Sequence, residues 1–458
     1  MAEWATVESS VVASKRRITS STVRAILNGT STAKLKILMP DLALRTALDK
    51  EFRPTRGEFL QTLFIELSPG RGMRTLPLNL GILLDNSGSM EGDKLERAKR
   101  ACSLILDQLS PEDRAAVAVF SSGSRVVVPS APFGEGASFK ARQNVMDVRV
   151  EGATELLAGL NTIYKEIEPF KSPGNTTFVI VLSDGQPTDA QGFIDRDLDK
   201  FLERSKSEFE RGGVSLSTIG LGSAADYDAT FLRDLADKGS GKFLMAATPE
   251  DLAATFQDEF GRIASTVLSD VTIEVSRLNG RARRFWRVVP DKKIFDAPQV
   301  TNNSFRVPVG SVQNDQPQAY LLDVVTSAPE GAKSRDLLCQ IAAWSSANPN
   351  QRAEINVLTG YSDNEVELAQ RNGEVVRLLE EANDFKLQVD LEAAVKSGDR
   401  RKMTQVLERK KKMTQRLGKT SATKVLEEME DTLDRGGQIS ADTLAVSSAE
   451  TKKTKRLA

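Results

Sequence analysis

The 458-residue sequence predicts an α/β fold, in which a Rossmann-like, doubly wound domain is inserted in an antiparallel β-sandwich and followed by a C-terminal helical segment. Three observations predict it. From about residue 76 to 265, short apolar strands alternate with longer amphipathic helices, as in a parallel sheet covered on both faces. From residue 267 the apolar residues recur with period two, which is typical of antiparallel strands. Beyond about residue 364 the chain is highly charged, and its apolar residues recur with the period of a helix.

The doubly wound domain begins with an apolar run, Leu78–Leu84, that predicts a strand buried on both faces. A helix follows, since apolar residues recur at helical spacing from Leu95 to Leu109. A short Ser-Ser-Gly-Ser link at 121–124 predicts a hairpin, which gives the sheet one antiparallel edge. The remaining elements are helices at 155–170, about 195–211, 228–238 and 249–266, and strands at 177–182, 214–221 and 242–246.

The β-sandwich is predicted from short alternating or β-branched runs separated by Pro, Asn and Gly turns. These runs cover 271–275, 283–289, 304–309, 319–325, 336–344 and 354–358, with 34–38 and 58–67 upstream. The predicted divisions are a flexible N-terminal tail (1–20), N-terminal sandwich strands (21–72), the α/β domain (73–266), the sandwich (267–360), a helical hairpin region (361–435) and a disordered tail (436–458).

Composition excludes several classes of function. The chain has 62 Lys and Arg against 63 Asp and Glu, so no overall charge attracts nucleic acid or an anionic membrane. Histidine is absent, which removes the usual general base, the Ser-His pair and the imidazole metal ligand. Two scattered cysteines favour a reducing compartment. Without a signal peptide pattern or an apolar span, the expectation is a soluble, cytoplasmic protein.

Three loops of the α/β domain carry hydroxyl or carboxylate oxygens. Asp85, Ser87 and Ser89 follow the first strand, Thr154 precedes a helix, and Asp184 follows a central strand. The first loop by itself is compatible with an ordinary helix cap as well as with a cation site. Because ligands of a doubly wound sheet bind outside the carboxyl ends of the strands, the three loops are expected to converge at one edge.

This order and spacing resemble the von Willebrand factor A domain with its metal-ion-dependent adhesion site. The resemblance implies that five residues form the site, namely Asp85, Ser87, Ser89, Thr154 and Asp184. It also implies a divalent cation, with Mg²⁺ favoured over Ca²⁺ and Mn²⁺, that is completed by an Asp or Glu of a protein partner. More broadly, the layout of residues 55–435 is similar to bacterial proteins called calcium-activated chloride channel-like, a name that implies no channel activity here.

The functional hypothesis is a non-enzymatic, metal-dependent adaptor or scaffold. A Mg²⁺-dependent phosphoryl-transfer site is disfavoured because the chain has no Gly-rich phosphate loop followed by Lys-Ser/Thr. Two alternatives are an accessory subunit or client adaptor of an AAA+ ATPase and a component of a kinase/phosphatase signalling system. The basic run at 409–412 lies among many acidic residues, so we interpret it as a solvated helix face rather than a nucleic-acid or lipid patch.

Overall fold

The computed structural model describes residues 41–70, 73–134, 136–184, 198, 200, 214–221, 229–246, 248–314, 316–328 and 335–452. The predicted tail at 1–20, the strand at 34–38 and nearly all of the helix at 195–211 lie outside these residues. None of the described helices combines the length and the apolar character needed to cross a membrane.

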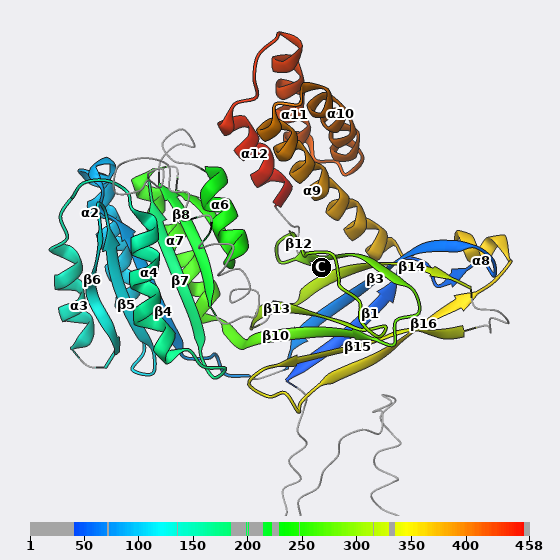
Figure 1. The fold of residues 1–458 in the computed structure, drawn as a ribbon, viewed down its shortest axis with the longest axis horizontal. Helices are drawn as coiled ribbons and strands as arrows, with labels where there is room; N and C mark the ends of the chain where they lie inside the picture. Colours follow the sequence, from blue (N-terminus) through cyan, green and yellow to red (C-terminus); the bar gives the residue numbers. More distant parts are fainter. Residues whose placement is uncertain are drawn as a thin grey trace, which may run out of the picture. The chain divides into compact units, whose positions relative to one another are not determined.

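The α/β domain is built on a six-stranded sheet in the order β6-β5-β4-β7-β8-β9 (Figure 1). All neighbours are parallel except β5 and β6, which form the predicted hairpin. The strands are β4 (Leu78–Asp85), β5 (Arg114–Phe120), β6 (Ser124–Pro132), β7 (Thr176–Ser183), β8 (Ser215–Leu221) and β9 (Ser240–Ala246).

Helices cover both faces of this sheet. One face packs on α2 (Asp93–Leu106), α3 (Ala137–Met146) and α7 (Pro249–Ala264). The other face packs on α4 (Leu156–Ile167) and α6 (Ala229–Lys238). Two short 3-10 turns, η1 (Gly88–Met90) and η2 (Glu168–Phe170), complete the described elements of the domain. The predicted α/β architecture is confirmed in these residues.

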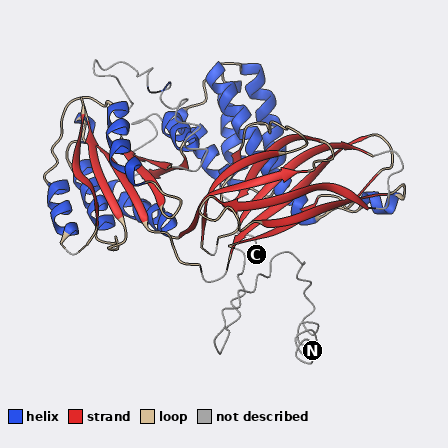
Figure 2. Ribbon diagram, turned by 60° about the horizontal axis from the view of Figure 1, so that its bottom comes forward, coloured by secondary structure: helices blue, strands red, loops and turns tan. Residues whose placement is uncertain are grey.

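Two five-stranded sheets share a second core (Figure 2). One has the order β1-β3-β14-β11-β12 and the other β13-β10-β15-β16-β2. β3 pairs with β14 over ten residues, so strands on either side of the α/β domain in sequence share a sheet, which is consistent with the predicted insertion. One short pair, β2 with β16, is parallel, so the arrangement is not purely antiparallel. The strands are β1 (Leu42–Leu48), β2 (Phe52–Arg53), β3 (Glu58–Pro69), β10 (Thr266–Ser276), β11 (Arg281–Val289), β12 (Lys293–Ile294), β13 (Phe305–Gln313), β14 (Gln318–Ser327), β15 (Arg335–Ser345) and β16 (Ala353–Tyr361).

The C-terminal part holds more helices than the predicted hairpin. They are α8 (Glu365–Ala369), α9 (Gly373–Ser397), α10 (Arg400–Arg416), α11 (Thr420–Asp434) and α12 (Ala441–Lys452). The chain turns at Gly398 and again at Gly418, and both glycines have a left-handed backbone with φ of 68° and 67°.

Helix α12 contradicts the prediction of disorder from 436 to 458 over its twelve residues. Its contacts with α9 and α10 include two hydrogen bonds: the Ser447 hydroxyl donates to Gln388 Oε1 at 2.7 Å, and Lys410 Nζ donates to Thr451 Oγ1 at 2.9 Å. Leu444 also packs on the apolar cluster of the preceding helices. Hydrogen bonds and a single leucine leave no periodic apolar pattern in the sequence, which is why composition predicted a solvated tail.

Candidate functional site

Asp85 is the last residue of β4, a central strand whose eight residues are all buried. Its carboxylate is 0% exposed and accepts two hydrogen bonds, from the Ser87 backbone N–H at 2.8 Å and from the Ser183 hydroxyl at 2.6 Å. Burial raises the pKa of Asp85 to about 6 against the opposing effect of the hydrogen bonds from Ser183 and Ser87. β4 therefore places a buried carboxylate, which accepts hydrogen bonds from Ser87 and Ser183, at the carboxyl ends of the strands.

The loop after Asp85 turns two hydroxyl groups toward the neighbouring strand end. Ser87 Oγ and Ser89 Oγ lie 3.1 Å apart, and Ser89 Oγ donates to Asp184 Oδ1 at 2.7 Å. Ser87 is almost fully buried, whereas Ser89 is exposed, so the cluster opens to solvent on the Ser89 side.

Asp184 directly follows β7, the strand that pairs with β4 in parallel register. Its side chain is 0% exposed, and its second oxygen, Oδ2, lies 2.5 Å from the ammonium of Lys94. Lys94 belongs to the first turn of α2 and keeps 30% of its side chain exposed. One ammonium thus faces a cluster that contains two buried carboxylates.

The Thr154 loop is tied to the first loop through its backbone. Gly88 N donates to Gly152 O at 3.0 Å, and Glu151 N donates to Asn86 O at 2.8 Å. Thr154 itself is 9% exposed. Among the described residues, no hydrogen bond joins its hydroxyl to the other four side chains, so the structure links Thr154 to the cluster by the loop alone.

Two contacts of this cluster were not predicted from the sequence. Neither Ser183 nor Lys94 is among the predicted site residues, although Ser183 directly precedes Asp184 and Lys94 lies one helical turn beyond the first loop. The neighbouring Gly185 lies outside the described residues.

The donor set fits a hard divalent cation, because its three hydroxyls and two carboxylates are all oxygen ligands. In the part of the chain that the structure describes, no three or more His, Cys, Asp or Glu side chains gather in a way that could hold a metal. An ion here would therefore depend on hydroxyl groups beside the two aspartates, and this assignment stays a prediction.

Comparison with known families identifies the domain. The family model for the von Willebrand factor type A domain matches residues 79–259. This part of the chain is a von Willebrand factor type A domain. The match spans β4 to α7 and includes every predicted site residue. A domains are generally non-enzymatic modules that mediate protein–protein interaction.

Curated relatives share the A domain at low identity. Inter-alpha-trypsin inhibitor heavy chain H4 of Homo sapiens is 27% identical over 52% of this chain and 26% of its own length. Uncharacterized protein YfbK of Escherichia coli is 26% identical over 46% of this chain and 35% of its own length. The chain thus spans about a quarter to a third of these relatives.

Solved structures match over nearly the whole chain, at an identity that bears on the fold alone. A von Willebrand factor type A protein from Catenulispora acidiphila has a TM-score of 0.74 and 18% identity, covering 91% of this chain and 98% of the other. The ArnB paralog VWA2 from Sulfolobus acidocaldarius has a TM-score of 0.55 and 18% identity, covering 90% and 97%.

Proposed function

We propose that the A domain binds a protein partner through a divalent cation, and that this chain acts as a non-enzymatic adaptor or scaffold. The observation that carries the proposal is the contact between two strand ends. Ser89, from the loop after β4, donates to Asp184, which follows β7. Oxygen donors from separate loops thereby converge where ligands of a doubly wound sheet bind.

In this proposal Asp85, Ser87, Ser89, Thr154 and Asp184 surround the ion, with Mg²⁺ favoured. The ion would supply a positive centre that accepts a further oxygen ligand. A partner's Asp or Glu fits this role because the protein donors include only two carboxylates, which Lys94 offsets in part. The exposed Ser89 side is where such a carboxylate would approach.

Metal binding is tested first, by calorimetric titration of Mg²⁺ and Mn²⁺ into the full chain. Asp85→Ala is expected to abolish binding. Because it also removes a buried group that accepts two hydrogen bonds, this variant alone does not separate loss of the ion from loss of the fold. Ser89→Ala removes one hydroxyl from an exposed residue and is expected to keep the fold while weakening binding. Asp147→Ala, an exposed carboxylate after α3, is the matched control and should bind like the wild type. Equal binding by all four proteins would refute the site.

Partner binding is tested by pull-down from native lysate with the full chain as bait. Proteins retained in Mg²⁺ are expected to elute with EDTA and to be absent from the Ser89→Ala bait. If EDTA and Asp85→Ala both leave the retained proteins unchanged, metal-dependent binding is wrong even where titration detects an ion. No observation on the described residues favours the AAA+ or the kinase/phosphatase alternative.

A further inference from the structure

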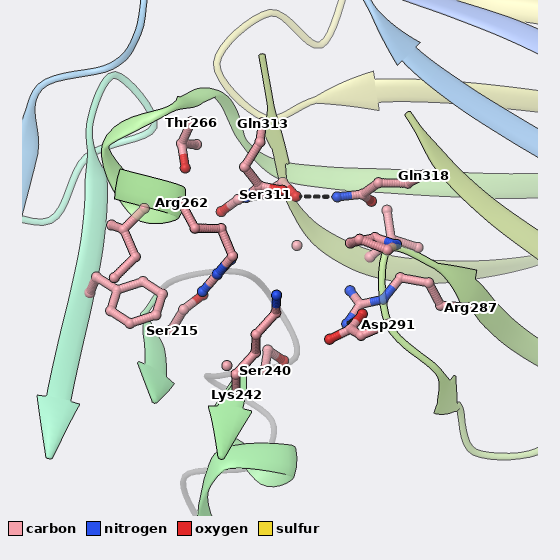
Figure 3. Close-up of a pocket in the computed structure, with 16 residues that line it drawn as sticks. Ser215, Ser240, Lys242, Arg262, Thr266, Arg287, Asp291, Ser311, Gln313 and Gln318 are labelled. Atoms are coloured by element: carbon pink, nitrogen blue, oxygen red, sulfur yellow. Dashed lines mark hydrogen bonds and ion pairs between the residues drawn. The ribbon is translucent and has the colours of Figure 1, made fainter. Parts of the chain in front are cut away.

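A cavity of about 30 Å³ lies where the A domain meets the β-sandwich (Figure 3). The A domain contributes residues of β8, β9 and α7 to its lining, and the sandwich contributes residues of β11, β13 and β14. A cavity that holds one water molecule needs at least about 10–15 Å³, so this one has room for a small ion. Three cationic side chains line it: Lys242, Arg262 and Arg287.

Each of the two arginines has a carboxylate of its own. Arg262 Nε donates to Glu259 Oε2 at 2.9 Å, and Glu259 also accepts from the Ser217 hydroxyl at 2.6 Å. Arg287 lies 2.6 Å from the carboxylate of Asp291. These two pairs balance their own charges, one on the A-domain side and one on the sandwich side.

Lys242 has no such counter-ion. Its ammonium makes no hydrogen bond or ion pair with any residue that the structure describes, and in Figure 3 it points between Arg262 on one side and Arg287 with Asp291 on the other. Burial lowers the pKa of Lys242, and the positive charge of Arg262 lowers it further, against the opposing effect of the Asp291 and Glu259 carboxylates.

A second donor is also unused. Arg287 Nε is buried without an acceptor among the described residues. Lys242 is half-buried, so a negatively charged acceptor between its ammonium and the buried N–H of Arg287 would satisfy both donors.

We propose that this cavity binds a small monovalent anion, such as chloride, that bridges Lys242 of the A domain and Arg287 of the sandwich. The charge favours a monovalent anion, because one positive charge is left among the described lining residues after the two arginine–carboxylate pairs. The anion would stabilise the contact between the two parts, independently of the metal site.

The test compares thermal unfolding of the full chain in chloride and in gluconate at constant ionic strength, without divalent ions. Wild-type protein should show a saturable rise in Tm of about 2–4 °C as chloride replaces gluconate. Lys242→Met keeps the aliphatic stem and should lose this dependence, while in gluconate its Tm should equal or exceed that of the wild type. Lys140→Met, at an exposed position of α3, is the matched control and should respond to chloride like the wild type.

Comparing wild type and Lys242→Met in both salts separates anion binding from a merely structural role of Lys242. If Lys242 were only structural, its removal would lower Tm equally in chloride and in gluconate. Crystals grown in bromide locate the ion directly: an anomalous peak is expected within hydrogen-bond distance of Lys242 Nζ in the wild type and not in Lys242→Met. A cavity without bromide, bromide at exposed positions as an adventitious ion only, or a chloride response shared by Lys242→Met would each overturn the proposal.

Discussion

Replacing Lys94 by Met should tighten divalent-metal binding at the proposed A-domain site. Lys94 Nζ lies 2.5 Å from Asp184 Oδ2, so the ammonium occupies one oxygen of a predicted metal ligand. A divalent ion that uses this oxygen must displace the ammonium or share the carboxylate with it. In either case the positive charge of Lys94 opposes the ion.

The magnitude follows from the exposure of the pair. A hydrogen bond to a charged group contributes about 1.5–3 kcal/mol, and the estimate belongs at the lower end because 30% of the Lys94 side chain is exposed to screening solvent. Since about 1.4 kcal/mol corresponds to a factor of ten, Lys94→Met should lower the Kd for Mg²⁺ or Mn²⁺ about tenfold. The same change leaves the buried Asp184 without its counter-ion, so the metal-free variant should unfold at a lower temperature.

Calorimetric titration of the metal-free full chain measures the first effect, and thermal unfolding in EDTA measures the second. Lys94→Arg keeps the charge and is the matched control, which should bind metal with affinity close to that of the wild type. If Lys94→Met binds the ion no tighter than the wild type, or more weakly, Lys94 orients Asp184 rather than competing for it, and this reasoning is wrong.

Three further predictions concern stability. Gly159→Ala would place a Cβ 2.8 Å from Phe120 Cβ, so it should destabilise the chain by about 1–3 kcal/mol in urea unfolding. Asp270→Asn should stabilise the chain above pH 6 by about 1 kcal/mol, because burial raises the pKa of Asp270 to about 6. The protonated form is favoured on folding, so this gain should vanish as pH falls below about 4. Lys410→Met should cost about 3 kcal/mol, because it breaks a fully buried ion pair with Asp384 at 2.9 Å.

Each of the three has a control and a contradicting result. Gly123→Ala, whose Cβ would meet open space, should be tolerated, and equal losses at the two glycines would contradict the packing argument. For Asp270→Asn, a Tm advantage that persists unchanged down to pH 4 would show that charge burial is not the cause. The control for Lys410→Met is Lys412→Met on the exposed face, which should leave the free energy of unfolding unchanged. A similar loss of stability in both variants would argue against a role of burial.

The sequence predicted the A-domain sheet well because burial on both faces leaves a local signal. The apolar run before Asp85 forms a strand with every residue buried, and the short link at 121–124 closes a hairpin in which Phe120 pairs with Ser124. Strand β1 shows the opposite case. Its sequence, LALRTAL, contains good helix formers, and the antiparallel ladder with β3 decides its conformation.

The convergence of the candidate site followed from topology. Because β4 and β7 are parallel neighbours, the residues after them must lie close, and Ser89 does contact Asp184. The position of Lys94 could not be inferred the same way. A long side chain on the exposed start of a helix can turn in several directions, and only the packed structure fixes which one it takes.

The run at 409–412 was interpreted as a solvated helix face, and Lys410 shows where that reasoning failed. Lys410 continues the buried stripe of Met403, Val406 and Leu407 at helical spacing and is 0% exposed. A lysine in such a stripe needs a buried acceptor, which Asp384 of α9 supplies. The Lys410 ammonium also donates to the Thr451 hydroxyl. The lysine that was interpreted as part of a solvated face therefore also connects α10 to α12.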